Sequence, residues 1–155
     1  MSLSKNAIIS VFDKSKLDLL GQHLKQDYNI YSTGGTSKYL RNLDIDVKDV
    51  SSYTEFPEIL GGRVKTLHPK IYGGLLSTDS EENQKEISKY HINQFSLVVV
   101  NLYPFEKVIS EIGDLEKMEE GDKKQELMNK CIEMIDIGGV TLLRAAAKII
   151  NMFVF

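Results

Sequence analysis

A valine-rich run in the second half of the chain, residues 96–102 (SLVVVNL), places the tightest constraint on the fold. Uninterrupted apolar, β-branched runs of this length are typical of strands that are buried on both faces of a sheet. Two similar runs, residues 7–12 and 28–31, and a shorter one, residues 47–50, come before it. Because segments with helical periodicity separate these runs, the sequence predicts an α/β fold: an open parallel sheet with helices on both faces.

The segments between the strands carry the spacing of amphipathic helices. Leu17, Leu20 and Leu24 recur at helical intervals, which predicts a helix over residues 14–26 with Asp13 as its cap. Further helices are predicted over residues 37–43, 81–89, 124–135 and 140–148. We expect residues 71–76 to form a strand or a close-packed crossing, residues 106–126 a helix and an exposed, mobile connection, and residues 149–155 a last strand.

Composition narrows the class of protein. A chain of 155 residues, with 42% hydrophobic and 26% charged residues, suits one globular domain. The net charge of −3 argues against a nucleic-acid-binding surface. The single cysteine, Cys131, excludes an internal disulfide, and three scattered histidines do not make a metal site. No apolar run reaches the roughly 18–20 residues of a membrane span. We therefore expect a cytoplasmic domain with no nucleic-acid or membrane partner.

The run LGGRVKTLHP, residues 60–69, concentrates groups that suit an anion. Paired glycines allow a backbone to approach a ligand closely. Arg63, Lys65 and Thr66 offer a forked guanidinium, a point charge and a hydroxyl donor. Arg63 and Lys65 would face the same way in an extended segment, since side chains alternate there. The pattern indicates either a site for a phosphate or polarised carbonyl, or a solvated basic turn.

Two other stretches are candidates for the same site. Residues 32–36 (STGGT) lie between a predicted strand and a predicted helix, an arrangement that directs backbone N–H groups at an anion, although the run is equally compatible with a simple turn. Asn101 and Tyr103 follow the strand at residues 96–102, and ligands of open α/β sheets bind outside the carboxyl ends of strands. Far downstream, residues 136–139 (DIGG) break a helical pattern.

Taken together, these motifs carry a resemblance to a known family. Residues 10–14, 32–36, 49–51, 56–69, 101–105 and 135–148 match it in order over nearly the whole chain. The chain resembles the N-terminal inosine monophosphate (IMP) cyclohydrolase domain of the bifunctional purine-biosynthesis enzyme, whose second domain is a formyltransferase. The resemblance implies a methylglyoxal-synthase-like (MGS-like) fold and closure of 5-formamidoimidazole-4-carboxamide ribotide (FAICAR) to IMP and water. It further implies no metal or organic cofactor, a homodimer, and a separate or fused AICAR transformylase partner.

The resemblance also assigns site residues. Those on the phosphate and ribose side would be Asp13, Lys14, Thr33, Gly34, Gly35, Thr36, Arg63, Val64, Lys65 and Thr66; those on the base side would be Asn101, Asp136 and Ile137. Its catalytic residues fall on Lys65, Tyr103, Asp136 and Lys148, with Lys148 as the proton donor and acceptor. A lysine whose pKa is lowered by burial or by a second cation can move protons near neutrality, and Lys65 beside Lys148 would supply that perturbation.

Simpler roles remain open for these catalytic residues. Lys148 is also placed to complement the dipole at a helix C-terminus, Asp136 to cap a turn, and Tyr103 to sit at the protein surface. The chain departs from the family at Phe12, where many relatives have serine, and in a longer connection over residues 106–126. It also stops soon after Lys148, so we expect a single domain over residues 1–155 that is cut before its usual end and lacks the transformylase domain.

The sequence leaves two other functional classes open. One is methylglyoxal synthase, which shares the fold and eliminates phosphate from dihydroxyacetone phosphate. The other is a regulatory module that binds a phosphate or nucleotide without turning it over. The runs RVKT, residues 63–66, and DIGG, residues 136–139, favour the cyclohydrolase over the synthase.

Overall fold

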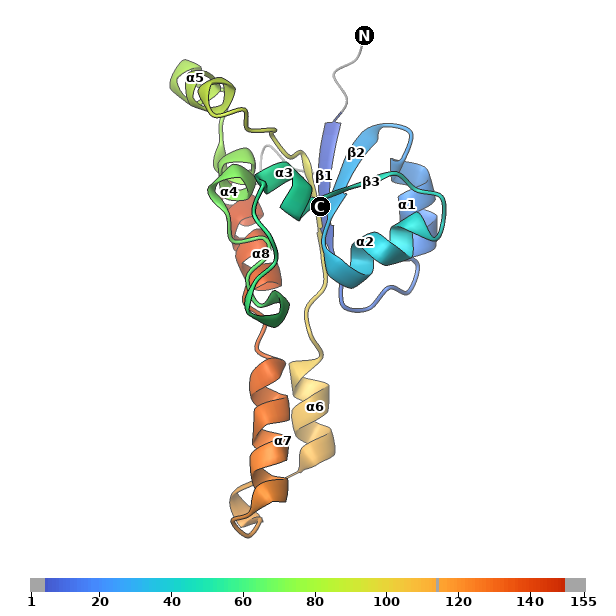
Figure 1. The fold of residues 1–155 in the computed structure, drawn as a ribbon, viewed down its shortest axis with the longest axis vertical. Coiled ribbons are helices and arrows are strands. Elements are labelled where there is room, and N and C mark those ends of the chain that lie inside the picture. The colour runs from blue at the N-terminus through green and yellow to red at the C-terminus, as the bar shows by residue number, and fades with distance from the viewer. Residues whose placement is uncertain (1–4, 114, 150–155) are drawn as a thin grey trace.

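The computed structural model describes residues 5–113 and 115–149. Strands and helices alternate from residue 5 to residue 54, and in the rest of the described chain helices precede and follow one further strand (Figure 1). The strands are β1 (Lys5–Ser10), β2 (Tyr28–Ser32), β3 (Val47–Asp49) and β4 (Leu97–Val100). The α-helices are α1 (Leu17–Leu24), α2 (Gly34–Arg41), α3 (Val50–Thr54), α4 (Pro69–Leu76), α5 (Glu81–Lys89), α6 (Phe105–Ile112), α7 (Asp122–Glu133) and α8 (Gly138–Lys148). Short 3-10 turns lie at Leu60–Gly62 and Leu115–Lys117.

The strands form one parallel sheet in the order β3-β2-β1-β4. In its register, Ile8 of β1 lies opposite Tyr31 of β2 and Val98 of β4. Strands β2 and β3 follow one another on one side of β1, and β4 pairs with β1 on its other side. The order of the strands therefore reverses at β1, and such a reversal opens a crevice at the carboxyl ends of the strands. The predicted parallel α/β sheet is confirmed.

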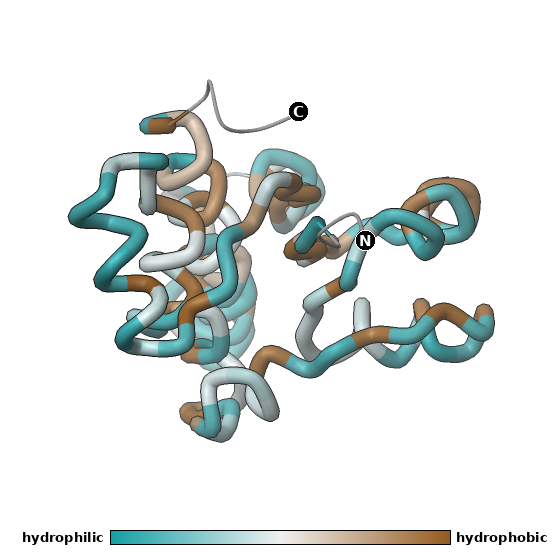
Figure 2. The backbone as a smooth tube through the Cα atoms, turned by 90° about the horizontal axis from the view of Figure 1, so that it is seen from above, coloured by the Kyte–Doolittle hydropathy of each residue, from teal (hydrophilic) through white to brown (hydrophobic). Residues whose placement is uncertain are grey.

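Two apolar layers cover the sheet, one on each face. Ile8 belongs to a cluster with residues of α4 and α8, including Ile71 and Leu142. Its neighbours Ala7 and Ile9 point to the other face, where they join the residues of α1 and α2. Seen from above, the two groups of helices lie on opposite sides of the strands (Figure 2). Both hydrophobic and hydrophilic residues occur along the helices. Because successive side chains of β1 point to opposite faces of the sheet, this strand contributes residues to both apolar layers.

Helices α6 and α7 form an antiparallel pair that projects from the body of the protein (Figure 1). They pack against each other, with Val108 and Cys131 as their buried residues. The predicted helix over residues 124–135 is thus the second arm of a hairpin. The connection over residues 106–126, expected to be a helix with an exposed linker, supplies the first arm and the tip.

Two local predictions are wrong. Asp13 does not cap α1: Lys16, in a left-handed conformation, precedes the helix, and the Asp13 carboxylate accepts hydrogen bonds from Ser15 instead. Residues 71–76 are not a strand but most of α4, which begins at Pro69 after the His68 ring accepts a hydrogen bond from the Lys70 N–H.

The expectation of close packing at residues 71–76 is nevertheless correct. A Cβ atom added to Gly74 would lie 2.1 Å from the Asn93 carbonyl oxygen and 2.9 Å from Cδ2 of Phe95. The Gly74 carbonyl also accepts a hydrogen bond from the Phe95 N–H at 3.0 Å. Helix α4 therefore lies directly on the segment that leads into β4.

The predicted last strand over residues 149–155 lies, apart from Ile149, outside the described residues. None of the helices within residues 5–113 and 115–149 combines the length and the apolar content that a membrane span requires.

The contact at Gly74 predicts an effect on stability with an unusual sign. Replacing a glycine inside a helix by alanine normally stabilises by roughly 0.5–1 kcal/mol. Because the added methyl group would overlap the Asn93 backbone, we expect Gly74→Ala to lower the free energy of unfolding by about 1–3 kcal/mol. Gly121→Ala is the matched control, since no atom lies within 4 Å of its added Cβ. Denaturant unfolding of both variants checks this, and a Gly74→Ala protein as stable as the unmodified chain would contradict the packing.

Candidate functional site

A cleft of about 660 Å³ opens at the carboxyl ends of β1 and β4. It is bordered by the segment after β1, the start of α2, the loop before α4, the segment after β4, and the junction of α7 and α8. Most of the predicted site residues line it: Lys14, Thr33, Gly35, Thr36, Arg63, Lys65, Thr66, Asn101, Tyr103, Asp136 and Ile137. Sequence segments that are far apart therefore meet where the strand order reverses.

The first turn of α2 forms one wall of the cleft, and two ammonium groups approach it. Thr33 is the N-cap residue and makes no side-chain hydrogen bond to the turn. The Lys65 ammonium lies 3.8 Å from the place where a Cβ of Gly34 would be, and the Lys14 ammonium 3.8 Å from that of Gly35. Thr36 fastens the turn to the end of β1, because its hydroxyl donates to the Val11 carbonyl at 3.0 Å. Helix dipole and side-chain charges thus favour an anion at the same place.

The loop that carries Arg63 and Lys65 is held by its own backbone. Residues 60–62 form a 3-10 turn, and Ile59 and Val64 close it as an antiparallel bridge with N–H to carbonyl distances of 3.1 and 3.4 Å. Arg63 has helical φ and ψ values, so the extended segment expected here is absent, although Arg63 and Lys65 still reach one cleft. Val64 does not line the cleft and instead shapes the loop through this bridge.

Helix α8 presents a second N-terminus to the cleft. The Asp136 carboxylate accepts hydrogen bonds from the N–H groups of Gly139 at 2.7 Å and Val140 at 3.4 Å. The buried Thr66 hydroxyl lies 3.1 Å from the place where a Cβ of Gly138 would be. The simpler role considered for Asp136, a cap, is therefore present, and it fixes the carboxylate at the edge of the cleft.

Asn101 connects the two strands whose ends form the cleft. Its side-chain oxygen accepts from the N–H groups of Phe12 at 2.6 Å and Asp13 at 3.1 Å, and its amide donates to the Asp13 carbonyl at 2.7 Å. The loop that carries Lys14 is thereby tied to the end of β4. Asp13 takes part through its backbone. Hydrogen bonds from the Ser15 backbone N–H and hydroxyl lower the pKa of the Asp13 carboxyl.

Apolar side chains surround the polar floor of the cleft. Phe12 and Tyr103 pack with ring centroids 5.2 Å apart. Ile132, Ile135 and Ile137 line the opposite side, and each is 53% exposed. The position at which relatives were expected to carry serine thus contributes an aromatic ring to the rim. A flat ring can be covered by such a rim while an attached phosphate reaches the cations below.

The structure does not bring Lys148 to the cleft. Helix α8 starts at the cleft and is 11 residues long, so Lys148 lies about 15 Å from Gly138 along its axis. The expected contact between Lys148 and Lys65 is therefore absent from this arrangement of the chain. Lys148 is the last residue of α8, where its charge complements the helix dipole.

Sequence reasoning missed some residues of the cleft. Glu133, the last residue of α7, forms an ion pair with Arg63. Together with Ile132 and Ile135, it enters the site because α7 ends at the cleft. The available signal was its place in the sequence, three residues before the predicted site residue Asp136.

A second hollow, of about 700 Å³, lies along the edge of β4. Its lining is mainly apolar and includes Leu20, Leu24, Leu97, Val99 and Leu143. It gathers none of the predicted site residues, whereas the cleft combines cations, two helix N-termini and an apolar rim. The cleft is therefore the candidate site for a phosphate ester that carries a planar ring.

Comparison with known proteins agrees with this architecture. A family model described as an MGS-like domain matches residues 16–141. The bifunctional purine biosynthesis protein PurH of Aquifex aeolicus (strain VF5) is 53% identical over 144 residues, 92% of this chain and 26% of that protein. PurH of Clostridium perfringens (strain SM101 / Type A) is 47% identical over 149 residues, 94% of this chain and 27% of that protein.

The chain thus spans about a quarter of the length of the curated relatives it matches. Among solved structures, the crystal structure of ForH aligns with a TM-score of 0.73 at 27% identity, covering 97% of this chain and 70% of that chain. The resemblance predicted from the motifs is confirmed, and the chain belongs to the MGS-like domain family.

Proposed function

We propose that the cleft binds FAICAR and closes its second ring to give IMP and water. The observation that carries this proposal is the convergence of Lys14 and Lys65 on the first turn of α2, below an apolar rim. Cations and unpaired N–H groups suit the phosphate, and the rim suits the imidazole ring. The relatives are bifunctional purine biosynthesis proteins, which supports a nucleotide of this pathway as the ligand.

The reaction places clear demands on such a site. The carboxamide nitrogen is a weak nucleophile because its lone pair is delocalised into the carbonyl group. As it attacks the formyl carbon, it must lose a proton, negative charge develops on the formyl oxygen, and that oxygen must be protonated before it leaves as water. Because both reacting groups belong to one molecule, holding them in contact supplies much of the rate enhancement.

The residues of the cleft fit these demands in part. Lys65 can stabilise the developing oxyanion and transfer a proton, and the Tyr103 hydroxyl is a second donor on the rim. Asp136 keeps the N-terminus of α8 in place, so that this helix end can contribute to the field at the oxyanion. The resemblance assigns proton transfer to Lys148 as well, which would require Lys148 to approach the cleft.

The position of Lys148 supports one alternative. If Lys148 stays at the far end of α8, the cleft still has its phosphate-binding groups but lacks one proton carrier. A regulatory module that binds a nucleotide without turning it over would need only the former.

We infer partners and location from the same relatives. Because these proteins are called bifunctional, we propose that the domain works with a fused or separate AICAR transformylase in the cytoplasm, as a homodimer. Size-exclusion chromatography with light scattering tests the homodimer, and a monomeric mass at all concentrations would contradict it.

Substitution of the two lysines separates catalysis from binding. We expect Lys65→Met to lower the turnover of FAICAR to IMP at least about a hundredfold, the scale of a lost acid–base or oxyanion-stabilising group. Lys123→Met, on the exposed start of α7, is the control. Ultraviolet absorbance follows IMP formation, and calorimetry measures IMP binding.

Lys148→Met completes this comparison. Loss of turnover with unchanged IMP binding would support the proton-transfer role of Lys148, and near-normal turnover would remove it from the mechanism. An unmodified chain that binds IMP but produces none would favour the regulatory alternative. Unchanged turnover in Lys65→Met would contradict the proposed chemistry.

Asn101 offers a test of positioning. Its three hydrogen bonds to the segment after β1 are exposed to solvent, so we expect Asn101→Ala to destabilise the unliganded protein by only about 1 kcal/mol. IMP affinity should also fall, about fivefold or more, because Lys14 is held less firmly. Asn129→Ala in α7, whose side-chain oxygen accepts only from Gln125 in the described part of the chain, is the control. Equal IMP affinities for Asn101→Ala and the unmodified chain would refute the positioning role.

A further inference from the structure

The ion pair between Arg63 and Glu133 joins two parts of the cleft that are distant in sequence. An Arg63 amino group donates to a Glu133 carboxylate oxygen. Arg63 comes from the loop between α3 and α4, and Glu133 is the last residue of α7. Both residues line the cleft. Both side chains are also exposed, at 68% and 51%, so the pair lies at the mouth of the cleft and within reach of a ligand.

The other cations of the cleft have no such partner. Among the described residues, neither Lys14 nor Lys65 takes part in an ion pair. The Lys14 ammonium donates to the Phe12 carbonyl at 3.2 Å. Glu133 is therefore the one carboxylate among the described residues that forms an ion pair with a cation lining the cleft.

We propose that Glu133 competes with the phosphate of the ligand for Arg63. A guanidinium presents the same fork of N–H donors to a carboxylate and to a phosphate. In the unliganded cleft, one amino group of that fork donates to Glu133, and this carboxylate adds a negative charge to the lining of the cleft. The proposal rests on the proposed function only in that the ligand is a phosphate ester, and it adds a residue that sets how tightly that ester binds.

Competition at Arg63 also links ligand binding to the α6–α7 hairpin. This hairpin projects from the body, and its two helices pack against each other (Figure 1). Its connections to the body, residues 101–104 and 134–137, both contain residues of the cleft. The Arg63–Glu133 pair is a further tie between α7 and the body. A phosphate that binds Arg63 in place of Glu133 breaks this ion pair between α7 and the body of the protein.

The competition predicts a specific change in affinity. Exposed ion pairs are weak, so removing the competing carboxylate should tighten IMP binding about two- to fivefold, or about 0.4–1 kcal/mol at 1.4 kcal/mol per tenfold. Glu133→Gln keeps the size of the side chain and removes its charge. Inosine lacks the phosphate, and its binding should not change. The difference between IMP and inosine therefore isolates the phosphate.

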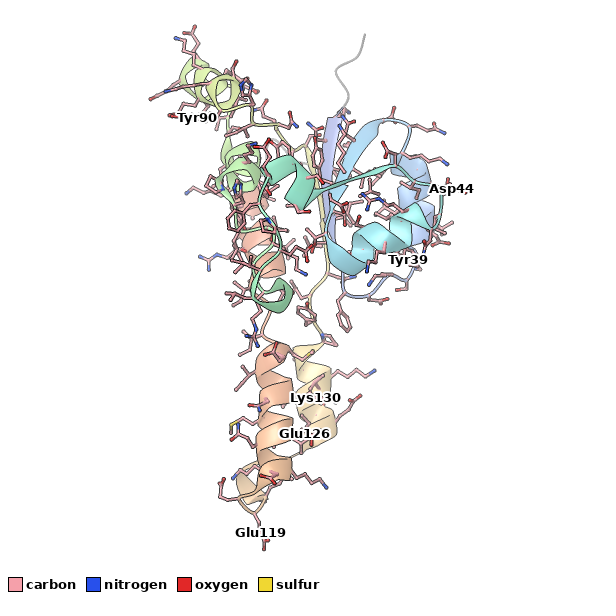
Figure 3. All side chains as sticks on the ribbon, viewed as in Figure 1. Tyr39, Asp44, Tyr90, Glu119, Glu126 and Lys130 are labelled. Atoms are coloured by element: carbon pink, nitrogen blue, oxygen red, sulfur yellow. The ribbon has the colours of Figure 1, made fainter. Side chains whose placement is uncertain are left out.

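Glu126→Gln is the matched control, because Glu126 lies on the same helix and its side chain is on the projecting hairpin (Figure 3). Seven residues separate it from Glu133, or about 10 Å along the axis, which is near the screening length at 0.1 M salt. Glu126→Gln therefore makes the same change in net charge as Glu133→Gln, but farther from the cleft. Calorimetric titration of the 155-residue chain at about 0.1 M salt should show tighter IMP binding for Glu133→Gln than for Glu126→Gln.

A double-mutant cycle with Arg63→Gln separates competition from simple repulsion. If Glu133 acts by occupying Arg63, the gain from Glu133→Gln should largely vanish when Arg63 is already glutamine. An equal gain in both backgrounds would overturn the proposal, because the carboxylate would then act through its field alone. IMP affinity unchanged by Glu133→Gln, or absent in both proteins, would also overturn it. Loss of turnover with this binding pattern intact would contradict only the proposed cyclohydrolase activity.

Discussion

The position of β1 between β2 and β4 is the constraint on which the rest of the structure depends. Ile8 faces one apolar layer, while Ala7 and Ile9 face the other, so both groups of helices pack on the same strand. The strand order reverses beside β1. The segments that follow β1 and β4 are therefore separated from each other. The cleft forms in the space between them, and its location follows from the topology before any site residue is considered.

The polar groups around the cleft divide into two kinds. Asn101 and Asp136 are committed to backbone N–H groups, and they hold the loop after β1 and the start of α8. Lys14 and Lys65, in contrast, are directed at the open first turn of α2. A framework that satisfies its own hydrogen bonds while it leaves cations unpaired is preorganised for an anion. Arg63 belongs to the second kind, but Glu133 occupies it.

The sequence predicted the parallel sheet and most of the cleft because both depend on local patterns. Apolar runs revealed the strands, and hydroxyl, glycine and cationic residues at strand ends marked the site. It could not predict contacts that tertiary packing decides. Residues 71–76 were expected to form a strand or a close-packed crossing, yet they lie in α4, and Gly73 and Gly74 allow that helix to pack against the segment before β4. The order of the motifs also did not show that the length of α8 separates Lys148 from Asp136. It likewise did not indicate that α7 places Glu133 beside Arg63.

We propose that the cleft holds a purine nucleotide with its phosphate at the N-terminus of α2 and its ring beside the N-terminus of α8. Titration of the isotope-labelled chain with IMP, followed by the chemical shifts of backbone amides, tests it most directly. We expect the largest shifts at Gly34, Gly35, Thr36, Gly138 and Gly139, with inosine causing much smaller shifts at the first three. Shifts confined to the hollow beside β4, at residues such as Leu24, Leu97 and Val99, would contradict it.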